Sequence, residues 1–277
     1  MPRACVIGWP VEQSRSPQIH GYWLKRYRIE GSYAAEAVRP DKLEDFLKSL
    51  AAKGYAGANV TLPHKEQALR AADATDAAAR AIGAANTLWL DDTGKLHASN
   101  TDTYGFMTNL RQVAPGWNDK RRPVVVLGAG GAARAVLYGL IGAGDSKILL
   151  LNRSRDSADA LAKIFGAIVE VRDWKDRNAA LEGCGLLVNT TSLGMMGKPR
   201  LKLDLAALPK DAVVADIVYN PLETELLAAA RSRGNRTVDG LGMLLYQAVP
   251  GFERWFGVRP EVTPELREQI ASTLGRK

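Results

Sequence analysis

Two hydrophobic patterns alternate along the first hundred residues. Apolar runs at 4–8, 33–38 and 57–61 have the length and composition of β-strands. Between the second and third runs, leucine and phenylalanine side chains recur at positions 43, 46, 47 and 50, which is the spacing of one helix face. The order strand, helix, strand predicts an α/β region.

A hairpin pattern follows this region. Residues 86–90 and 95–100 read as two extended segments, and the short sequence DDTG separates them. Gly94 in this turn adopts positive φ at little steric cost, as a tight turn requires. The pattern favours an antiparallel edge on a mostly parallel sheet.

The second half of the chain contains runs rich in leucine and β-branched residues. They lie at 123–128, 147–152, 167–172, 186–192 and 213–219. Near-continuous apolar runs are typical of parallel strands that are buried on both faces, and the segments between them are long enough for crossover helices. We therefore expect a doubly wound sheet.

The stretch 111–123 is polar and contains two prolines and a glycine, so we place a domain boundary near it. After residue 240 the pattern is helical to the end. There, Thr263, Pro264 and Glu265 supply an N-cap, a first-position proline and an early acid.

Composition narrows the possible classes of protein. Of the 277 residues, 46% are hydrophobic, enough for a substantial core. We find no signal peptide and no window of roughly 18 uninterrupted apolar residues that would span a membrane. Cys5 and Cys184 lie in apolar contexts typical of reduced cysteines, which favours a cytoplasmic location.

The chain has a net charge of +7. Its basic residues are dispersed rather than clustered and interleaved with aromatic residues, which argues against a nucleic-acid-binding protein. A carboxylate substrate and a phosphate-rich cofactor also suit this charge. His20, His64 and His97 are scattered, and no spacing of histidine with cysteine or acid predicts a metal site.

A glycine-rich motif joins the first strand of the second half to a helix. Gly128, Gly130 and Ala133 occupy the positions of G-x-G-x-x-G/A. Glycines permit the close approach of a pyrophosphate to backbone N–H groups at a helix N-terminus. The alternative is a glycine-rich turn that binds nothing, but the flanking strand and helix favour a dinucleotide site.

The end of the next strand indicates which dinucleotide binds. An NAD site usually carries an acid about 20 residues after the motif. Here the strand ends in Asn152, Arg153 and Ser154, and no acid occurs until Asp156. A guanidinium can form two hydrogen bonds with a 2′-phosphate, so NADP is indicated; the alternative is an exposed polar turn.

Seven further polar motifs occur in a fixed order along the chain. They are Ser14-Arg15-Ser16-Pro17, Asn59-Val60-Thr61-Leu62-Pro63-His64-Lys65, Gly83-Ala84-Ala85-Asn86-Thr87, Asn100-Thr101-Asp102, Asn189-Thr190-Thr191-Ser192-Leu193-Gly194-Met195, Asp216-Ile217-Val218-Tyr219-Asn220-Pro221 and Asp239-Gly240-Leu241-Gly242-Met243 with Gln247. Together with the glycine motif and Asn152-Arg153-Ser154, they closely resemble the shikimate dehydrogenase family over nearly the whole chain.

The resemblance implies an N-terminal α/β substrate domain (1–110), a doubly wound Rossmann-like NADP domain (111–241) and C-terminal helices (242–277) that pack back on the first domain. It implies reduction of 3-dehydroshikimate to shikimate with NADPH. The implied partner is this small-molecule substrate, with neither nucleic acid nor membrane, and the chain is expected to be a monomer or homodimer.

The resemblance also assigns site residues. Those implied for substrate are Ser14, Ser16, Asn59, Thr61, Asn86, Tyr219 and Gln247. Those implied for the cofactor are Gly128, Ala129, Gly130, Gly131, Ala132, Asn152, Arg153, Ser154, Ile217, Gly240 and Met243. Hydroxyls and amides offer the donors and acceptors that a small polyol acid needs.

Lys65 and Asp102 are the expected catalytic residues. Hydride reduction of a ketone produces an alkoxide that must receive a proton, and oxidation reverses this transfer. A lysine can exchange that proton, and a neighbouring carboxylate can orient the lysine. Outside these motifs, the favoured interpretation of such a pair would be an ordinary salt bridge.

Two positions depart from the family pattern. Gln13 stands where a histidine is common, and Ser157 stands where a second basic residue often follows the cofactor turn. Either Arg155 substitutes for that basic residue, or the preference for NADP is weaker than usual in the family. The alternatives are a quinate/shikimate dehydrogenase with a broader substrate or cofactor range and a catalytically silent NADP-binding regulator. Arg153 argues against the first, and the intact Lys65 and Asp102 argue against the second.

Overall fold

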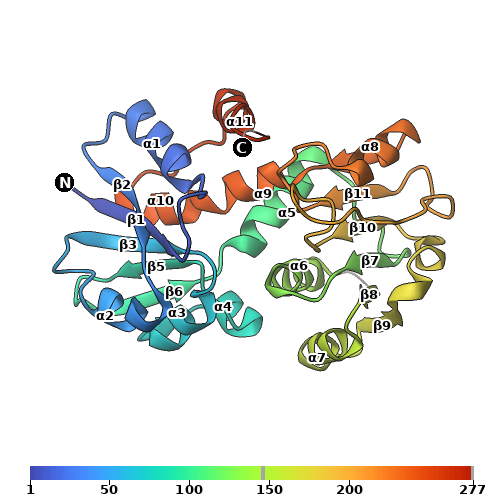
Figure 1. The fold of residues 1–277 in the computed structure, drawn as a ribbon, viewed down its shortest axis with the longest axis horizontal. Coiled ribbons are helices and arrows are strands. Elements are labelled where there is room, and N and C mark those ends of the chain that lie inside the picture. The colour runs from blue at the N-terminus through green and yellow to red at the C-terminus, as the bar shows by residue number, and fades with distance from the viewer. Residues whose placement is uncertain (145–146, 276–277) are drawn as a thin grey trace. The chain divides into compact units, whose positions relative to one another are not determined.

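The computed structural model describes residues 1–144 and 147–275 (Figure 1). The chain divides into two compact units. Met1–Thr101 and Gln247–Ile270 form the first, while Asp102–Tyr246 and the chain from Ala271 onward form the second. Each unit contains its own sheet, so each is described separately below.

Among the described residues, the first unit has a six-stranded sheet of order β2-β1-β3-β5-β6-β4. Its strands are β1 (Arg3–Gly8), β2 (Ser32–Ala37), β3 (Tyr55–Val60), β4 (Ala74–Thr75), β5 (Thr87–Leu90) and β6 (Leu96–Ser99). β2 and β3 pair parallel with β1, whereas β5 is antiparallel to both β3 and β6. The expected hairpin is confirmed.

The expectation of an antiparallel edge is wrong. β4 pairs parallel with β6 and forms the edge, so the antiparallel strand β5 lies inside the sheet. β4 has two residues, too few to produce an alternating pattern that a sequence could reveal.

Helices cover both faces of this sheet (Figure 1). They are α1 (Ser16–Arg26), α2 (Leu43–Lys48, after the 3-10 turn Pro40–Lys42), α3 (Lys65–Ala71), α4 (Ala77–Ile82), α10 (Ala248–Phe256) and α11 (Pro264–Ala271). Cys5, Ile7 and Leu88 of the sheet pack with Leu43 and Leu47 of α2. The core on this face therefore comes from alternate strand residues.

Aromatic side chains hold α10 against the sheet and helix α1 of the first unit. Trp255 donates from Nε1 to the carbonyl oxygen of Leu88 at 2.9 Å, and a Cβ on Gly57 would lie 2.2 Å from the same Nε1. Phe252 lies with its ring centroid 5.3 Å from that of Trp23 in α1. Residues Gln247–Ile270 thus pack back on the first unit, as expected for most of the C-terminal segment, whereas 242–246 and the described residues from Ala271 belong to the second unit.

The second unit has a parallel sheet of order β12-β11-β10-β7-β8-β9 among the described residues. Its strands are β7 (Val124–Leu127), β8 (Ile148–Asn152), β9 (Val169–Asp173), β10 (Leu186–Asn189), β11 (Val213–Asp216) and β12 (Arg236–Val238). From the other edge this is the doubly wound order, with its reversal between β7 and β10. The predicted doubly wound fold is confirmed.

Both faces of this sheet are buried. Val124, Val126 and Leu150 contribute to one core cluster, while Val125 and Leu149 contribute to the opposite one. Its helices are α5 (Asp102–Val113), α6 (Gly131–Gly142), α7 (Arg155–Phe165), α8 (Glu225–Ser232) and α9 (Gly240–Tyr246). Two-sided burial explains the near-continuous apolar runs in the sequence.

Two of the expected crossover connections contain no α-helix among the described residues. Between β9 and β10 lie the 3-10 turns Trp174–Asp176 and Ala179–Leu181, and the described stretch from β10 to β11 contains no helix. Gly194 and Gly197 both adopt positive φ in that stretch, at 87° and 76°. Glycines in this conformation interrupt a right-handed helix.

The boundary between the units falls after Thr101, earlier than the polar stretch 111–123. Phe106, Met107 and Leu110 of α5 belong to the core of the second unit. The chain returns to the first unit at Gln247, five residues after the expected start of the C-terminal segment at 242.

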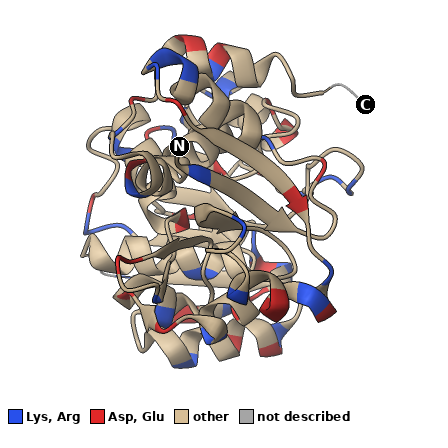
Figure 2. Ribbon diagram, turned by 90° about the vertical axis from the view of Figure 1, so that its left-hand side faces the viewer, with Lys and Arg blue, Asp and Glu red and all other residues tan. Residues whose placement is uncertain are grey.

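No helix in residues 1–144 and 147–275 is long and apolar enough to cross a membrane. Figure 2 shows basic and acidic residues interspersed over the ribbon rather than gathered in a single stripe.

Candidate active site

Most of the expected substrate residues lie at one edge of the first sheet. Asn59 is near the end of β3 and Thr61 follows it, while Asn86 directly precedes β5. Because β5 runs antiparallel to β3 and β6, its first residue meets their carboxyl ends. Open α/β sheets commonly bind ligands at such an edge.

A continuous chain of hydrogen bonds runs along this edge. The Tyr33 hydroxyl donates to Oδ1 of Asn59 at 2.6 Å, and Nδ2 of Asn59 donates to the carbonyl oxygen of Asn86 at 3.2 Å. Oδ1 of Asn86 accepts from the backbone N–H of Thr101 at 2.8 Å, and its Nδ2 lies 3.4 Å from Oε1 of Gln247. The fold thus brings together Asn59, Asn86 and Gln247.

The paired serines are also neighbours. The backbone N–H of Ser16 donates to Oγ of Ser14 at 3.3 Å, and Ser16 is buried at the start of α1. Burial raises the pKa of Tyr33 well above its usual value, while a hydrogen bond with Ser16 acts in the opposite direction. The Tyr33 hydroxyl therefore stays neutral and acts as a donor to Asn59.

The loop before α3 is tightly packed. The N–H of Thr61 donates to the carbonyl oxygen of Ile7 at 2.9 Å, and a Cβ on Gly8 would lie 2.4 Å from Cγ2 of Thr61. Lys65 is the first residue of α3 and is half-buried, and its carbonyl oxygen accepts from the N–H of Ala85 at 2.9 Å. These contacts hold Thr61 and Lys65 at the edge of the first sheet.

Asp102 begins α5 in the second unit and is half-buried. An acid in the first turn interacts favourably with the partial positive charge of a helix N-terminus. The hydroxyl of the next residue, Thr103, donates to the carbonyl oxygen of Ala135 at 2.8 Å and thereby ties the start of α5 to α6.

The glycine-rich turn has the geometry that a pyrophosphate site needs. Gly128 adopts φ +104°, and a Cβ there would lie 2.7 Å from Oγ1 of Thr190. Gly130 and Gly131 at the start of α6 are exposed, and a Cβ on either would meet no protein atom within 4 Å. Open space at a helix N-terminus with free backbone N–H groups suits a phosphate.

The turn after β8 carries the arginine that is expected to bind the 2′-phosphate. Arg153 is exposed and makes no ion pair within the part of the chain that the structure describes. Arg155, the candidate substitute for a second basic residue, is instead paired with Asp173 and lies 3.6 Å from Asp159. Ser157 donates from its N–H to Oγ of Ser154 at 3.4 Å and closes the N-cap of α7.

The residues implied for the nicotinamide lie on neighbouring segments of the second unit. A Cβ on Gly240 would lie 2.2 Å from the carbonyl oxygen of Ile217, so only glycine fits this approach. Ile217 and Met243 both pack against the same core cluster. Tyr219 is half-buried in the loop after β11.

Several residues with evident structural roles were not singled out from the sequence. Tyr33 is one member of an ordinary strand, and Thr101 was recognised only as a neighbour of Asp102. The hydroxyl of Thr101 donates to the carbonyl oxygen of Gln247 at 2.8 Å. Asp216 is buried among polar partners, but its sequence context is that of a strand end. An acid at the end of the apolar run Val213–Ala215 was the available signal.

The two units together define a dinucleotide-dependent α/β dehydrogenase, with a doubly wound nucleotide unit and a separate unit bearing a polar substrate edge. The matching family models are the shikimate dehydrogenase substrate binding domain over residues 6–88, shikimate/quinate 5-dehydrogenase over 111–216 and the shikimate 5′-dehydrogenase C-terminal domain over 240–264. The chain belongs to the shikimate dehydrogenase family.

Individual relatives agree with this assignment. A shikimate dehydrogenase (NADP(+)) of Rhodopseudomonas palustris (strain HaA2) is 58% identical, covering 99% of this chain and 97% of its own. The solved shikimate 5-dehydrogenase of Thermus thermophilus in complex with NADP(H) and shikimate is 35% identical with a TM-score of 0.85, covering 98% and 99%. A quinate dehydrogenase of Corynebacterium glutamicum in complex with NAD is 32% identical with a TM-score of 0.90, covering 98% and 99%.

Proposed function

We propose that this chain catalyses the reversible NADPH-dependent reduction of 3-dehydroshikimate to shikimate, a step in aromatic amino-acid biosynthesis. The observation that carries the proposal is the hydrogen-bonded chain from Tyr33 through Asn59 and Asn86 to Gln247. It consists of hydroxyl and amide groups, which suit a small hydroxylated ring. The 58% identity to an NADP-dependent shikimate dehydrogenase supports the same substrate.

The proposed substrate residues divide by chemistry. The hydroxyls of Ser14 and Ser16 would bind the substrate carboxylate, and their proximity supports this shared role. Hydroxyl and amide side chains would hold the ring hydroxyls, namely those of Asn59, Thr61, Asn86, Tyr219 and Gln247. Asn59 is 4% exposed and accepts a hydrogen bond from Tyr33. It would therefore contribute mostly by holding the neighbouring substrate residues in place.

Lys65 would exchange the proton at the reacting oxygen. In the reductive direction its ammonium donates a proton to the oxygen of the substrate carbonyl as that carbon is reduced, and the reverse reaction returns the proton. The position of Lys65 at the start of α3 supports this role because backbone contacts fix the loop around it. Asp102 would orient Lys65 and share its proton.

The nicotinamide of NADP supplies or accepts the hydride when it is bound. The residues present fit this cofactor, since open space lies beside Gly130 and Gly131 and Arg153 has no ion pair within the described residues. Arg153 would bind the 2′-phosphate, with Asn152 and Ser154 shaping its turn through the hydrogen bond from Nδ2 of Asn152 to the Ser154 carbonyl oxygen at 2.9 Å.

The state of the cysteines supports a cytoplasmic location for this activity. Cys5 and Cys184 are free and buried. Burial raises the pKa of the Cys184 thiol to about 12, which leaves it protonated and unreactive at neutral pH. Reduced buried cysteines are ordinary in a reducing compartment.

The decisive experiment is a spectrophotometric assay of NADPH formation with shikimate and quinate in parallel. We expect kcat/KM to be higher for shikimate, because the additional hydroxyl of quinate would crowd Ser14 and Ser16. The discrimination there is modest, since binding sites reject an added group less reliably than a missing one. A value for quinate that equals or exceeds that for shikimate would identify a quinate/shikimate dehydrogenase instead.

A further inference from the structure

A buried carboxylate ends the strand β11. Asp216 is 2% exposed, and within the described residues no lysine, arginine or histidine pairs with it. Its Oδ1 accepts from Nδ2 of Asn189 at 2.9 Å and from the N–H of Val218 at 3.0 Å, and its Oδ2 accepts from the hydroxyl of Thr224 at 2.7 Å. The negative charge is therefore held by neutral donors alone.

These partners come from three separate segments of the second unit. Asn189 ends β10, and its Oδ1 accepts from the N–H and hydroxyl of Thr191 at 3.1 and 2.7 Å. Val218 belongs to the loop after β11, and Thr224 is the N-cap of α8. Asp216 thus joins the loop after β10, the loop after β11 and the beginning of α8.

The joined segments also contact two parts of the proposed cofactor site, the pyrophosphate turn and the nicotinamide border. Thr190, next to Asn189, donates from its hydroxyl to the carbonyl oxygen of Leu127 at 2.7 Å and packs against Gly128 of the glycine-rich turn. Ile217, next to Asp216, packs against Gly240 through its carbonyl oxygen. The network therefore runs from the pyrophosphate turn to the segment proposed to border the nicotinamide.

Burying the Asp216 carboxylate destabilises the fold. Removing a carboxylate from water without a cationic partner disfavours its charged form. Consistent with this, burial raises the pKa of Asp216 to about 6, while the hydrogen bonds from Thr224, Val218 and Asn189 act in the opposite direction. A costly charge at the carboxyl edge of a doubly wound sheet indicates a role in ligand binding rather than in stability.

We propose that Asp216 is the positioning residue for the nicotinamide half of the cofactor, holding the Asn189–Thr191 and Ile217–Val218 segments in the arrangement that this half requires. The proposal rests on the proposed NADP-dependent function. The 2′-phosphate end of the adenosine half would bind at the separate turn Asn152–Ser154, so we expect its affinity to depend much less on Asp216.

The test compares two ligands by isothermal titration calorimetry. NADP⁺ contains both halves of the cofactor, whereas adenosine 2′,5′-bisphosphate lacks the nicotinamide. Asp216→Ala leaves the donors of Asn189, Val218 and Thr224 without an acceptor. We expect its Kd for NADP⁺ to rise by about ten- to a hundredfold. Its Kd for adenosine 2′,5′-bisphosphate should stay within about twofold of the wild type.

A conservative variant separates hydrogen bonding from charge. In Asp216→Asn the amide oxygen can still accept from Asn189 and Val218, and the amide nitrogen can donate to the hydroxyl of Thr224, which is able to accept. We expect this variant to recover NADP⁺ affinity to within about threefold of the wild type. If Asp216→Ala does not fold, Asn189→Ala decides the question, since it detaches the β10 segment and should selectively weaken NADP⁺.

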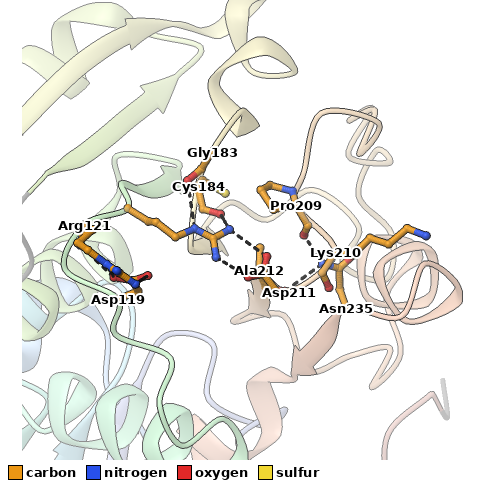
Figure 3. A network of polar contacts seen from close by, with 10 residues as sticks. Asp119, Arg121, Gly183, Cys184, Pro209, Lys210, Asp211, Ala212 and Asn235 are labelled. Atoms are coloured by element: carbon orange, nitrogen blue, oxygen red, sulfur yellow. Dashed lines mark hydrogen bonds and ion pairs between the residues drawn. The ribbon is translucent and has the colours of Figure 1, made fainter.

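Asp211→Asn is the matched control. Asp211 precedes the same strand at its opposite end and is exposed, with Oδ2 and Oδ1 accepting from Arg122 at 2.8 and 3.2 Å. Arg122 also donates to the carbonyl oxygens of Gly183 and Cys184, which Figure 3 shows near Asp211. An exposed ion pair contributes little, so both Kd values should match the wild type.

Three results would overturn the inference. They are unchanged NADP⁺ affinity in a folded Asp216→Ala variant, an equal loss of both ligands, and an Asp216→Asn variant as weak as Asp216→Ala. A wild-type chain that binds neither ligand would instead refute the proposed NADP-dependent function, and the inference with it.

Discussion

Nε2 of His64 lies 2.7 Å from the carbonyl oxygen of Val38, so the ring of His64 ties the loop before α3 to the end of β2. A carbonyl oxygen only accepts, and Nε2 is therefore the donor. His64 is 1% exposed and directly precedes Lys65. This contact helps to fix the position of the residue that we propose to exchange the substrate proton.

Lys65→Ala should lower kcat by about 10²–10⁴-fold, the usual effect of losing a general acid–base, with a much smaller change in KM. Substrate binding should survive because Ser14, Ser16 and Asn86 remain. Steady-state kinetics with shikimate and NADP⁺ would measure both constants. Lys48→Ala is the matched control, since Lys48 is exposed and paired with Glu44 on α2.

Asp102→Asn should also lower kcat severely, because Asp102 is proposed to orient Lys65. The double variant Lys65→Ala/Asp102→Asn should lose far less than the product of the two single effects, since residues that act as a unit are not additive. Multiplicative losses in the same assay would indicate independent roles. A raised KM with intact kcat in Lys65→Ala would show that Lys65 only binds substrate.

Arg153→Ala should lower kcat/KM with NADP⁺ by roughly ten- to a hundredfold, which corresponds to the loss of a charge-assisted contact with the 2′-phosphate. Activity with NAD⁺ should remain nearly unchanged. Arg155→Ala is the comparison variant, because Arg155 is already paired with Asp173 and Asp159. Its effect should be small and equal for both cofactors, and a selective loss of NADP⁺ use in Arg155→Ala would reverse the assignment.

Two glycine variants should separate cofactor binding from stability. Gly130→Ala places a Cβ where no protein atom lies within 4 Å, at a φ of −91° that alanine tolerates. We expect the free energy of unfolding to change by less than about 1 kcal/mol while the Kd for NADP⁺ rises about tenfold or more.

Gly128→Ala should behave differently, because Gly128 has φ +104° and its Cβ would lie 2.7 Å from Oγ1 of Thr190. This variant should lose about 1–3 kcal/mol of stability in urea denaturation. Equal stability of the two variants would contradict the described turn geometry.

The pH dependence of stability should reveal Asp216. Burial raises its folded-state pKa from 3.8 to about 6, so the native state holds this proton more tightly than the unfolded state. The stability associated with the bound proton is therefore lost as pH rises through about 6. Between pH 5 and pH 8 this group should lower the free energy of unfolding by about 1–2 kcal/mol.

Asp216→Asn cannot titrate and should lack this component. Urea denaturation of both proteins at pH 5 and pH 8 would measure this component. The free energy of unfolding of the variant, relative to that of the wild type, should be higher at pH 8 than at pH 5. A difference that stays constant across this range would contradict the raised pKa.

Only part of the candidate site was predictable from local sequence. The glycine-rich turn and Arg153 belong to short segments whose backbone geometry and charge depend on neighbouring residues. The substrate edge is different, because Asn86 and Gln247 are 161 positions apart and Tyr33 is 26 positions from Asn59. Their hydrogen bonds exist only after the sheet has formed and α10 has packed on it.

The sequence by itself determined five strands of the second sheet, β7 to β11, because two-sided burial demands continuous apolar runs such as Val124–Leu127. It did not predict the short edge strand β12. It also determined the family, through motifs that hold their order along the chain. The tertiary structure alone decided that α5 belongs to the second unit, that β4 forms an edge and that Arg155 is occupied by Asp173. It also decided that Asp216 accepts hydrogen bonds from Asn189, Val218 and Thr224. In each of these cases local preference is weak, and packing with distant residues settles the outcome.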